Sequence, residues 1–124
     1  MKRNYDIGLL ILRIGMAGLM LTHGIPKLMS FIGGDMSVVG DPFGIGGLLT
    51  SILVIIGEVI APILIIIGIK TRLSAVVSGI TMAVAAFVIH GSDPLAKKEM
   101  ALLYLIGFIA IALMGAGSVS VDKK

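Results

Sequence analysis

Residues Leu48–Ile69 read LLTSILVIIGEVIAPILIIIGI and decide the fold, because this stretch holds a single charged side chain, Glu58. An apolar run of about 20 residues is long enough to cross the hydrocarbon core of a bilayer as a helix. Similar runs precede and follow it, and together they predict four spans at about Ile7–Phe31, Leu48–Ile69, Leu73–His90 and Ala101–Ala116. The last two are short and are expected to borrow flanking residues. The sequence therefore predicts an all-α, integral membrane four-helix bundle, with residues 1–124 as one transmembrane domain.

The composition agrees with a chain that is solvated by lipid. Hydrophobic residues make up 57% and charged residues 14%, whereas soluble domains have about 45–50% and about 25%. The formal charge of +3 is spread over predicted helix ends, which favours lipid headgroups as the contact and not nucleic acid. The chain has no cysteine. A disulfide, a thiol nucleophile and an iron–sulfur cluster held by its own thiolates are therefore excluded.

The distribution of positive charge predicts the orientation. Six basic residues fall on one side of the predicted membrane and three on the other. The first side has Lys2, Arg3, Lys70, Arg72, Lys123 and Lys124, and the second has Lys27, Lys97 and Lys98. Cytoplasmic loops carry the excess of Lys and Arg in membrane proteins. We therefore expect both termini in the cytoplasm of a cell whose plasma membrane holds the protein.

Two charged residues are predicted well inside the bilayer. A charge at the centre of a span costs at least about 2.5–3.5 kcal/mol, so it normally has a partner. At a rise of about 1.5 Å per residue, Arg13 lies about 9 Å and Glu58 about 16 Å from the cytoplasmic edge. Because an extended Arg side chain covers that offset, we predict a buried Arg13–Glu58 pair.

Pro62 follows Glu58 by four residues and has no N–H to give to the Glu58 carbonyl. We expect the helix to bend there and to leave that carbonyl unpaired beside the acidic side chain, in a polar pocket that faces the bundle interior. The alternative is a proline kink with a neutralised Glu58 that only sets the register of the helices.

A second group of ionisable residues is predicted near the opposite membrane face. His23 lies just before Gly24-Ile25-Pro26, which is expected to break or bend the first helix, and Lys27 lies one turn further on. His90 and Glu99 flank the last connection. Histidine relays protons near neutral pH, so this cluster is suited to binding and protonating a small carbonyl compound or a quinone head group. Alternatively, His90 and Glu99 are interfacial caps and only His23 is buried.

Other cofactors receive less support from the residue pattern. Two histidines are compatible with axial haem ligation, but nothing else in the sequence favours haem. No His-x₃-His or carboxylate–His spacing occurs on one predicted helix, so no metal site is predicted.

Two further features bear on packing. Ala75, Gly79 and Ala83 form a row of small residues that lets helices approach closely; we expect it to serve contacts within the bundle, with a homo-oligomer as the alternative. The connection Ser30–Gly47 is rich in glycine but also contains apolar residues such as Phe43. It is expected either to fold back as a lid or to lie as a flexible interfacial loop.

The order of short motifs along nearly the whole chain resembles the DoxX family of small prokaryotic membrane proteins. The motifs are Leu12-Arg13, Gly15, His23-Gly24, Lys27-Leu28, Gly57-Glu58, Pro62, Gly68-Ile69-Lys70-Thr71-Arg72-Leu73, Glu99, Ala101-Leu102-Leu103, Gly115, Gly117 and Asp122. The resemblance implies a four-helix bundle in a prokaryotic plasma membrane. It also implies recurrent polar positions at Arg13, His23, Lys27, Glu58, Arg72, His90 and Glu99.

Some members of that family are membrane subunits of thiosulfate:quinone oxidoreductases, and others act with soluble redox partners in oxidative stress. The resemblance thus implies a redox-linked subunit that works with a partner protein and receives a quinone between its helices. Since this chain has no cysteine, thiosulfate oxidation by this chain alone is not expected.

Three functions follow from these expectations. In the first, a redox-linked subunit, Glu58, His23 and Arg13 carry the chemistry while Lys27, His90 and Glu99 bind the quinone. In the second, the chain is a non-catalytic anchor or assembly subunit of a larger complex. The third, a small proton-coupled transporter, is disfavoured because such carriers are expected to be rich in aromatic residues, and this chain has no Trp and two Tyr.

Overall fold

The computed structural model describes residues 2–123 and shows helices and loops in that range, with no strand. The elements are α1 (Lys2–Ile32), α2 (Gly47–Ile55), η1 (Ile56–Ile60), α3 (Ala61–Ile67), α4 (Thr71–Val84), η2 (Ala85–Ile89) and α5 (Leu95–Met114). Here η1 and η2 are single π-helical turns that continue α2 into α3 and extend α4. The chain therefore forms four rods, as the hydropathy predicts.

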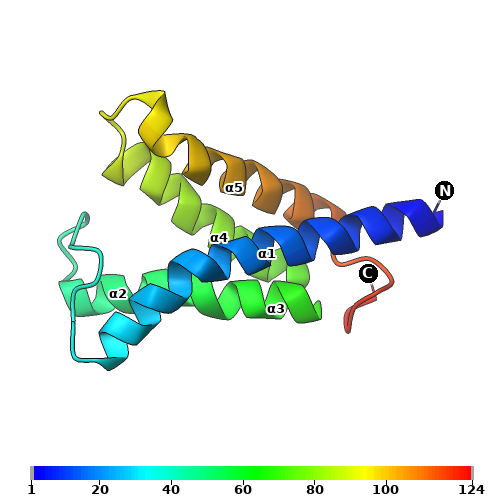
Figure 1. The fold of residues 1–124 in the computed structure, drawn as a ribbon, viewed down its shortest axis with the longest axis horizontal. Helices are drawn as coiled ribbons and strands as arrows, with labels where there is room; N and C mark the ends of the chain where they lie inside the picture. Colours follow the sequence, from blue (N-terminus) through cyan, green and yellow to red (C-terminus); the bar gives the residue numbers. More distant parts are fainter. Residues whose placement is uncertain (1, 124) are drawn as a thin grey trace.

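Both ends of the described chain lie at the same end of the bundle (Figure 1). The Ser118 hydroxyl donates to Asp6 in α1, and the N–H groups of Lys70 and Thr71 donate to the Asp122 carboxylate. We call this the terminal end, and the opposite end, which carries the connection 33–46, the loop end. α5 and the neighbouring part of α4 diverge from α1 and α2 toward the loop end (Figure 1).

The terminal end also gathers positive charge. Among the residues whose side chains the structure describes, Arg3, Lys70, Arg72 and Lys123 belong to this end. Lys124 and the side chain of Lys2, also assigned to it from sequence, lie outside the described residues. Because both ends of the described chain lie at the same end of the bundle (Figure 1), the chain crosses the membrane an even number of times. The cytoplasmic placement of this end stays a prediction from the charge excess.

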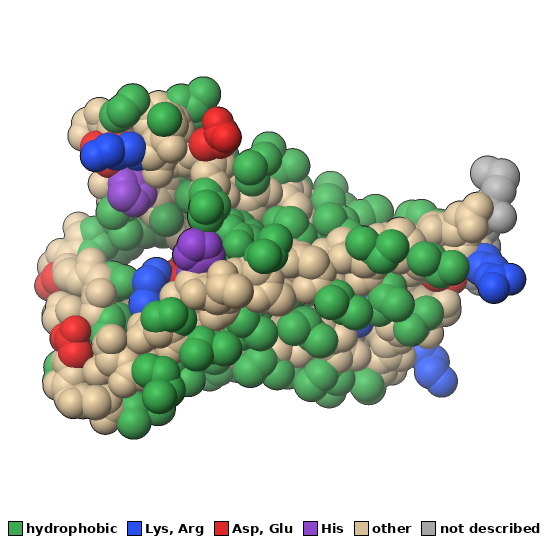
Figure 2. Space-filling view, viewed as in Figure 1, with side chains coloured by type: hydrophobic (Ala, Val, Ile, Leu, Met, Phe, Trp, Pro, Cys, Tyr) green, Lys and Arg blue, Asp and Glu red, His purple; other side chains and the backbone are tan. Residues whose placement is uncertain are grey.

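Three of the rods are long and apolar enough to cross a bilayer: Arg3–Ile32, Gly47–Ile67 and Thr71–Ile89. α5 has 20 residues, but its first turns carry Lys97, Lys98 and Glu99, so its apolar part begins at Met100. Hydrophobic side chains cover the visible face of the rods between the two ends (Figure 2). These exposed apolar surfaces contact the lipid bilayer.

The π-helical turn η1 follows from Pro62. The Ala61 N–H donates to the Ile56 carbonyl, five residues back, and the next nitrogen belongs to proline, which has no hydrogen. The Gly57 carbonyl therefore receives no hydrogen bond from Ala61, which donates to Ile56, and none from Pro62, which has no N–H. The buried Ser78 hydroxyl of α4 donates to it instead, at 2.7 Å. The predicted disturbance at Pro62 is therefore a widened turn in which the Gly57 carbonyl receives a hydrogen bond from outside the helix, while the unpaired carbonyl of Glu58 stays a prediction.

Two glycines, Gly24 on α1 and Gly57 in η1 itself, let α1 and α4 come close to this turn. A Cβ atom on Gly24 of α1 would overlap with the backbone carbonyl of Glu58, and one on Gly57 would overlap with the Thr81 hydroxyl. η1 is therefore packed tightly against α1 on one side and α4 on the other. Small residues at helix contacts serve this purpose in membrane proteins.

The small row on α4 faces α5, as the contact-within-the-bundle interpretation predicts. Ala75 and Gly79 are buried, and the position of Gly79 lies against Phe108 of α5. Phe108 is fully buried and stacks on Tyr104, with ring centroids 6.1 Å apart. A homo-oligomer remains a proposal.

Of the break or bend expected in α1 at Gly24-Ile25-Pro26, the break is wrong. The helix runs without interruption from Lys2 through Pro26 to Ile32, and a bend at this point stays a prediction. A proline removes one backbone donor and its ring crowds the carbonyl four residues back. Membrane helices tolerate this residue because neighbouring groups compensate locally.

Candidate functional site

Arg13 does not pair with Glu58, so the predicted ion pair is wrong. The Arg13 side chain is fully buried at the terminal end. Its Nε and one terminal nitrogen donate to the Ile65 and Ile66 carbonyls at the end of α3, at 3.1 and 2.9 Å. The other terminal nitrogen donates to the carbonyls of Ala116 and Val119, at 3.0 and 2.8 Å. Arg13 thus ties α1 to the end of α3 and to the C-terminal segment.

Glu58 has Lys27 as its partner instead. The Lys27 ammonium donates to both carboxylate oxygens of Glu58, each at 2.9 Å. Glu58 is 4% exposed, whereas the Lys27 side chain keeps 33% of its surface accessible. The buried carboxylate is therefore neutralised by a cation that still reaches open space.

The direction of helical side chains explains this choice. The Cα–Cβ bonds of a helix tilt toward its N-terminus. On α1, this tilt turns Arg13 toward the terminal end and turns Lys27 away from the loop end. On the antiparallel α2–η1 rod it turns Glu58 toward the loop end, so Glu58 and Lys27 approach each other. A depth estimate that ignores this tilt selects the wrong cation.

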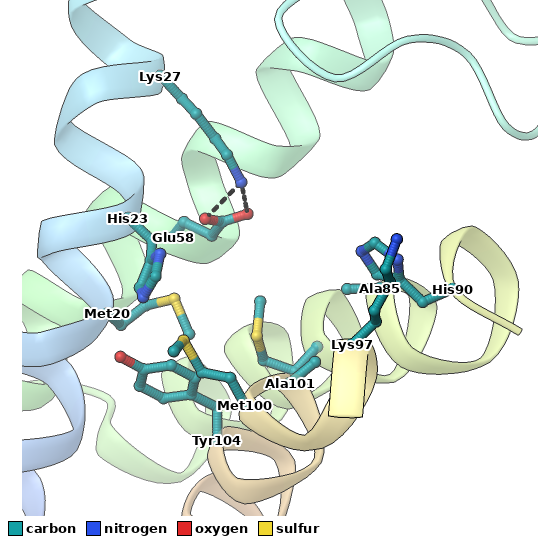
Figure 3. A pocket seen from close by; sticks show the side chains of 11 residues that line it. Met20, His23, Lys27, Glu58, Ala85, His90, Lys97, Met100, Ala101 and Tyr104 are labelled. Carbon is teal, nitrogen blue, oxygen red and sulfur yellow. Dashed lines mark hydrogen bonds and ion pairs between the residues drawn. The ribbon is translucent and has the colours of Figure 1, made fainter. Parts of the chain in front are cut away.

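The Lys27–Glu58 pair forms one wall of a cavity of about 200 Å³ at the loop end, which we call the polar cavity. The residues that line it are Met20, His23, Lys27, Glu58, Met82, Ala85, His90, Lys97, Met100, Ala101 and Tyr104. Lys27, Glu58, His23 and Tyr104 lie together on one side, and His90 and Lys97 face them across the open space (Figure 3). Histidine side chains border a hollow on the surface of the molecule (Figure 2).

Tyr104 links the polar cavity to the hydrophobic core. Its ring and the His23 ring meet nearly at right angles at a centroid distance of 5.8 Å, and it stacks on Phe108. Tyr104 is 8% exposed, whereas His23 is largely exposed to the cavity. The floor of the cavity is thus an aromatic stack. His23 is exposed, so the alternative in which it is the one buried residue of this group is wrong.

The opposite wall is held by a short turn between η2 and α5. His90 Nδ1 and the Asp93 carboxylate lie 2.8 Å apart, and Lys98 donates to the Gly91 carbonyl at 3.1 Å. The hydrogen bond from His90 lowers the pKa of Asp93 below its usual value. Asp93 therefore remains a carboxylate that fixes the ring of His90 at the mouth of the cavity.

The structure brings four of the six predicted site residues to the polar cavity: Glu58, His23, Lys27 and His90. Arg13 lies at the opposite end of the bundle. Glu99 is exposed on α5 and lines neither this cavity nor the neighbouring one described below. The sequence interpretation missed Lys97 and Tyr104 as lining residues. Their spacing of seven residues places them on one helix face and was a usable signal.

A larger, mostly apolar cavity of about 590 Å³ adjoins the first, and we call it the apolar cavity. It shares Lys27, Glu58, Ala85 and His90 with the polar cavity. Its other walls are the connection 33–46 and the facing sides of α2 and α4–η2, through Val39, Pro42, Phe43, Ile45, Thr50, Leu53, Val54, Ile80, Thr81, Val84 and Ile89. The connection therefore folds back as a wall and is not free in the interface.

Both π-helical turns border these cavities. Glu58 lies on η1 and Ala85 on η2, and both residues line both cavities. A π turn displaces the following side chains relative to an α-helix, and such turns recur at functional sites. The arrangement combines one carboxylate, two ammonium groups, two imidazoles and a phenol. It can donate hydrogen bonds to ligand oxygens and hold protons beside them.

Metal binding has a weaker structural basis. Within residues 2–123, no three histidine, aspartate or glutamate side chains gather in a way that could hold a metal ion. The groups that face the polar cavity are instead mainly donors, which suits an oxygen-bearing organic ligand.

Comparison with known proteins places the chain among relatives. The DoxX family model matches residues 8–91. A protein of Haemophilus influenzae (strain ATCC 51907 / DSM 11121 / KW20 / Rd), described as uncharacterized, is 33% identical over 130 residues, which cover 94% of this chain and 89% of that protein. No solved structure matches the chain significantly.

Proposed function

Because this chain belongs to the DoxX family of multi-pass prokaryotic membrane proteins and its polar residues meet in one cavity, we propose that it is a redox-linked membrane subunit that binds a quinone head group. The observation that carries the proposal is the Lys27–Glu58 pair, buried on the carboxylate side and accessible on the ammonium side. A partner redox protein supplies the electrons, since the chain has no cysteine of its own to hold an iron–sulfur cluster.

The polar cavity fits a single substituted ring. A cavity of about 150 Å³ is enough to hold benzene, and this one measures about 200 Å³. The Met20, Met82 and Met100 side chains supply adaptable apolar surface for a ring face. Lys27 and Lys97 supply donors for ring oxygens from opposite sides (Figure 3).

When bound, a quinone supplies the chemistry of a two-electron, two-proton carrier. The residues of this chain would bind, orient and exchange protons. Lys27 would hold a ring oxygen by a charge-assisted hydrogen bond, and Tyr104 would fix the ring against the aromatic floor. His23 and Glu58 would hold or accept the protons, since an imidazole and a carboxylate are the usual proton carriers in such sites.

Quinone binding to the purified protein in nanodiscs tests the proposal. We expect Glu58→Gln to weaken quinone binding at least about tenfold, because the variant lacks the negative charge that positions the Lys27 ammonium. Glu99→Gln is the matched control, since Glu99 lies outside both cavities, and it should bind as the wild type does. Wild-type protein that binds no quinone overturns the proposal. Glu58→Gln protein that loses folded yield but binds normally favours the anchor function.

A further inference from the structure

The apolar cavity directly adjoins the polar cavity. Lys27, Glu58, Ala85 and His90 line both cavities, so the two spaces meet at the same four side chains. The Lys27–Glu58 pair stands at this junction. A ligand that contacts the pair with its polar part therefore has the apolar cavity immediately beside it.

We propose that the two cavities form one bipartite site, in which the ring of an amphipathic quinone occupies the polar cavity and its hydrocarbon chain occupies the apolar cavity. This inference rests on the proposed function and narrows the substrate class to quinones that carry an alkyl or isoprenoid chain. The shared walls set the boundary between the polar and the apolar part of the ligand.

The walls of the apolar cavity select a hydrocarbon occupant. Apart from the shared residues, its polar side chains are Thr50 and Thr81. The Thr50 hydroxyl donates to the Gly46 carbonyl at 2.9 Å, and the Thr81 hydroxyl donates to the Val77 carbonyl at 3.0 Å. Both hydroxyl protons are thus already used, and a peptide or a sugar would bury its polar groups at a cost.

The connection 33–46 is fixed in place as the outer wall. The Asp41 carboxylate accepts hydrogen bonds from the Ile45 and Gly46 N–H groups, each at 2.9 Å. The Ser51 hydroxyl oxygen of α2 accepts one from the Val38 N–H at 3.0 Å. These bonds hold the Phe43 side chain where it lines the cavity, so the space is built into the fold.

The cavity also has accessible apolar walls within the membrane-spanning rods. Leu53 and Ile80 line it and are 50% and 60% exposed. They belong to two rods, Gly47–Ile67 and Thr71–Ile89, that are long and apolar enough to cross a bilayer. A chain-bearing quinone dissolves in the same hydrocarbon layer that surrounds these rods.

Two matched variants on neighbouring helical turns test the proposal. Val84 lines the apolar cavity, whereas Val88, four residues later, is 47% exposed and lines none of the cavities described. We expect Val84→Phe to fill part of the cavity and to weaken binding of a decyl-chain benzoquinone about tenfold relative to Val88→Phe. The same ring without a chain should bind both variants equally.

Comparison between variants cancels partitioning into the nanodisc, because each ligand dissolves equally in the lipid around either protein. Equal binding of the decyl compound by both variants would overturn the bipartite site while leaving the proposed function intact. A wild-type protein that binds neither compound would overturn the proposed function itself. A Val84→Phe variant that loses both compounds equally would also contradict the inference, since the defect would then not be specific to the chain.

Discussion

Arg13 and Glu58 are the buried charged residues of the described chain, and they lie in different surroundings. Arg13 is fully buried, and its guanidinium donates hydrogen bonds to backbone carbonyls at the terminal end. Glu58 is buried at the other end, where Lys27 neutralises it and remains partly exposed. A buried charge without a partner is costly in lipid, so each of these two side chains needs hydrogen-bond partners in its own surroundings. This division places the proposed site at one end and the structural tie at the other.

Removal of Lys27 tests the pair at the level of residues. Lys27→Met leaves the Glu58 carboxylate buried without its cation, and we expect a loss of about 1–3 kcal/mol in the free energy of unfolding. This is less than for a fully buried pair because Lys27 is a third exposed. The double variant Lys27→Met/Glu58→Gln should recover part of the loss, measured by denaturation in mixed micelles. Strictly additive losses would show that the pair contributes no coupling energy.

At the level of elements, the widened turn η1 determines where Glu58 stands. Pro62 removes a backbone donor, Ser78 replaces it from α4, and Gly24 lets α1 approach the same turn. Three elements therefore meet at one irregular turn, and the rest of the α2–α3 rod is regular helix. Irregular backbone at membrane depth persists where it is packed inside the protein.

A pair of glycine substitutions on α1 tests this packing. Gly24→Ala brings a Cβ into the Glu58 carbonyl, which belongs to backbone and moves only with the whole turn, whereas Gly18 has open space around it. We expect Gly24→Ala to cost about 1–3 kcal/mol and Gly18→Ala to be neutral or slightly stabilising. Thermal unfolding of both variants in the same detergent provides the comparison. Equal melting temperatures would contradict the close contact.

At the scale of the whole molecule, hydrogen bonds join the rods at the terminal end, whereas the rods lie apart at the loop end (Figure 1). Arg13, Asp122 and the turn after α5 join α1, α3 and α4, while Arg72 donates to the carbonyls of Ala112, Leu113 and Met114 at the end of α5. The rods diverge toward the cavities from this closed end (Figure 1). The protein is therefore held together at the end opposite its proposed binding site.

Substitution of Arg13 should separate stability from binding. In Arg13→Lys, one ammonium replaces a fork of donors that reaches two segments, and we expect a loss of about 2–4 kcal/mol in stability. Arg3→Lys at an exposed position should change stability by less than about 0.5 kcal/mol. Folded Arg13→Lys protein should bind quinone with wild-type affinity, measured in nanodiscs. Loss of quinone binding in the folded fraction would show that Arg13 contributes to the binding site after all.

The orientation in the membrane can be tested by single cysteines, because the natural chain contains none. Ser92→Cys lies in the exposed turn at the loop end, and Val121→Cys lies in the C-terminal segment, where Val121 is 62% exposed. With both termini in the cytoplasm, an impermeant maleimide should label only Ser92→Cys in intact cells and both variants after permeabilisation. The reverse pattern would show that the charge excess at the terminal end faces outward.

Much of the fold is determined by local sequence. The four rods, their approximate boundaries, the short α3–α4 junction and the packing role of Ala75 and Gly79 all follow from hydropathy and residue size. These properties act over one helix or between chain neighbours. A bilayer reinforces them, since each apolar run must satisfy its own backbone hydrogen bonds as a helix.

Only the tertiary structure decided which charges meet. Residue type and depth made Arg13 the natural partner of Glu58, but the tilt of side chains along antiparallel helices turns Arg13 toward α3 and brings Lys27 to Glu58. The same holds for the residues that complete the cavities, such as Tyr104 and the wall formed by the connection 33–46. Their positions depend on how each helix is rotated about its axis, and that rotation is fixed by contacts between distant segments that no single run of sequence contains.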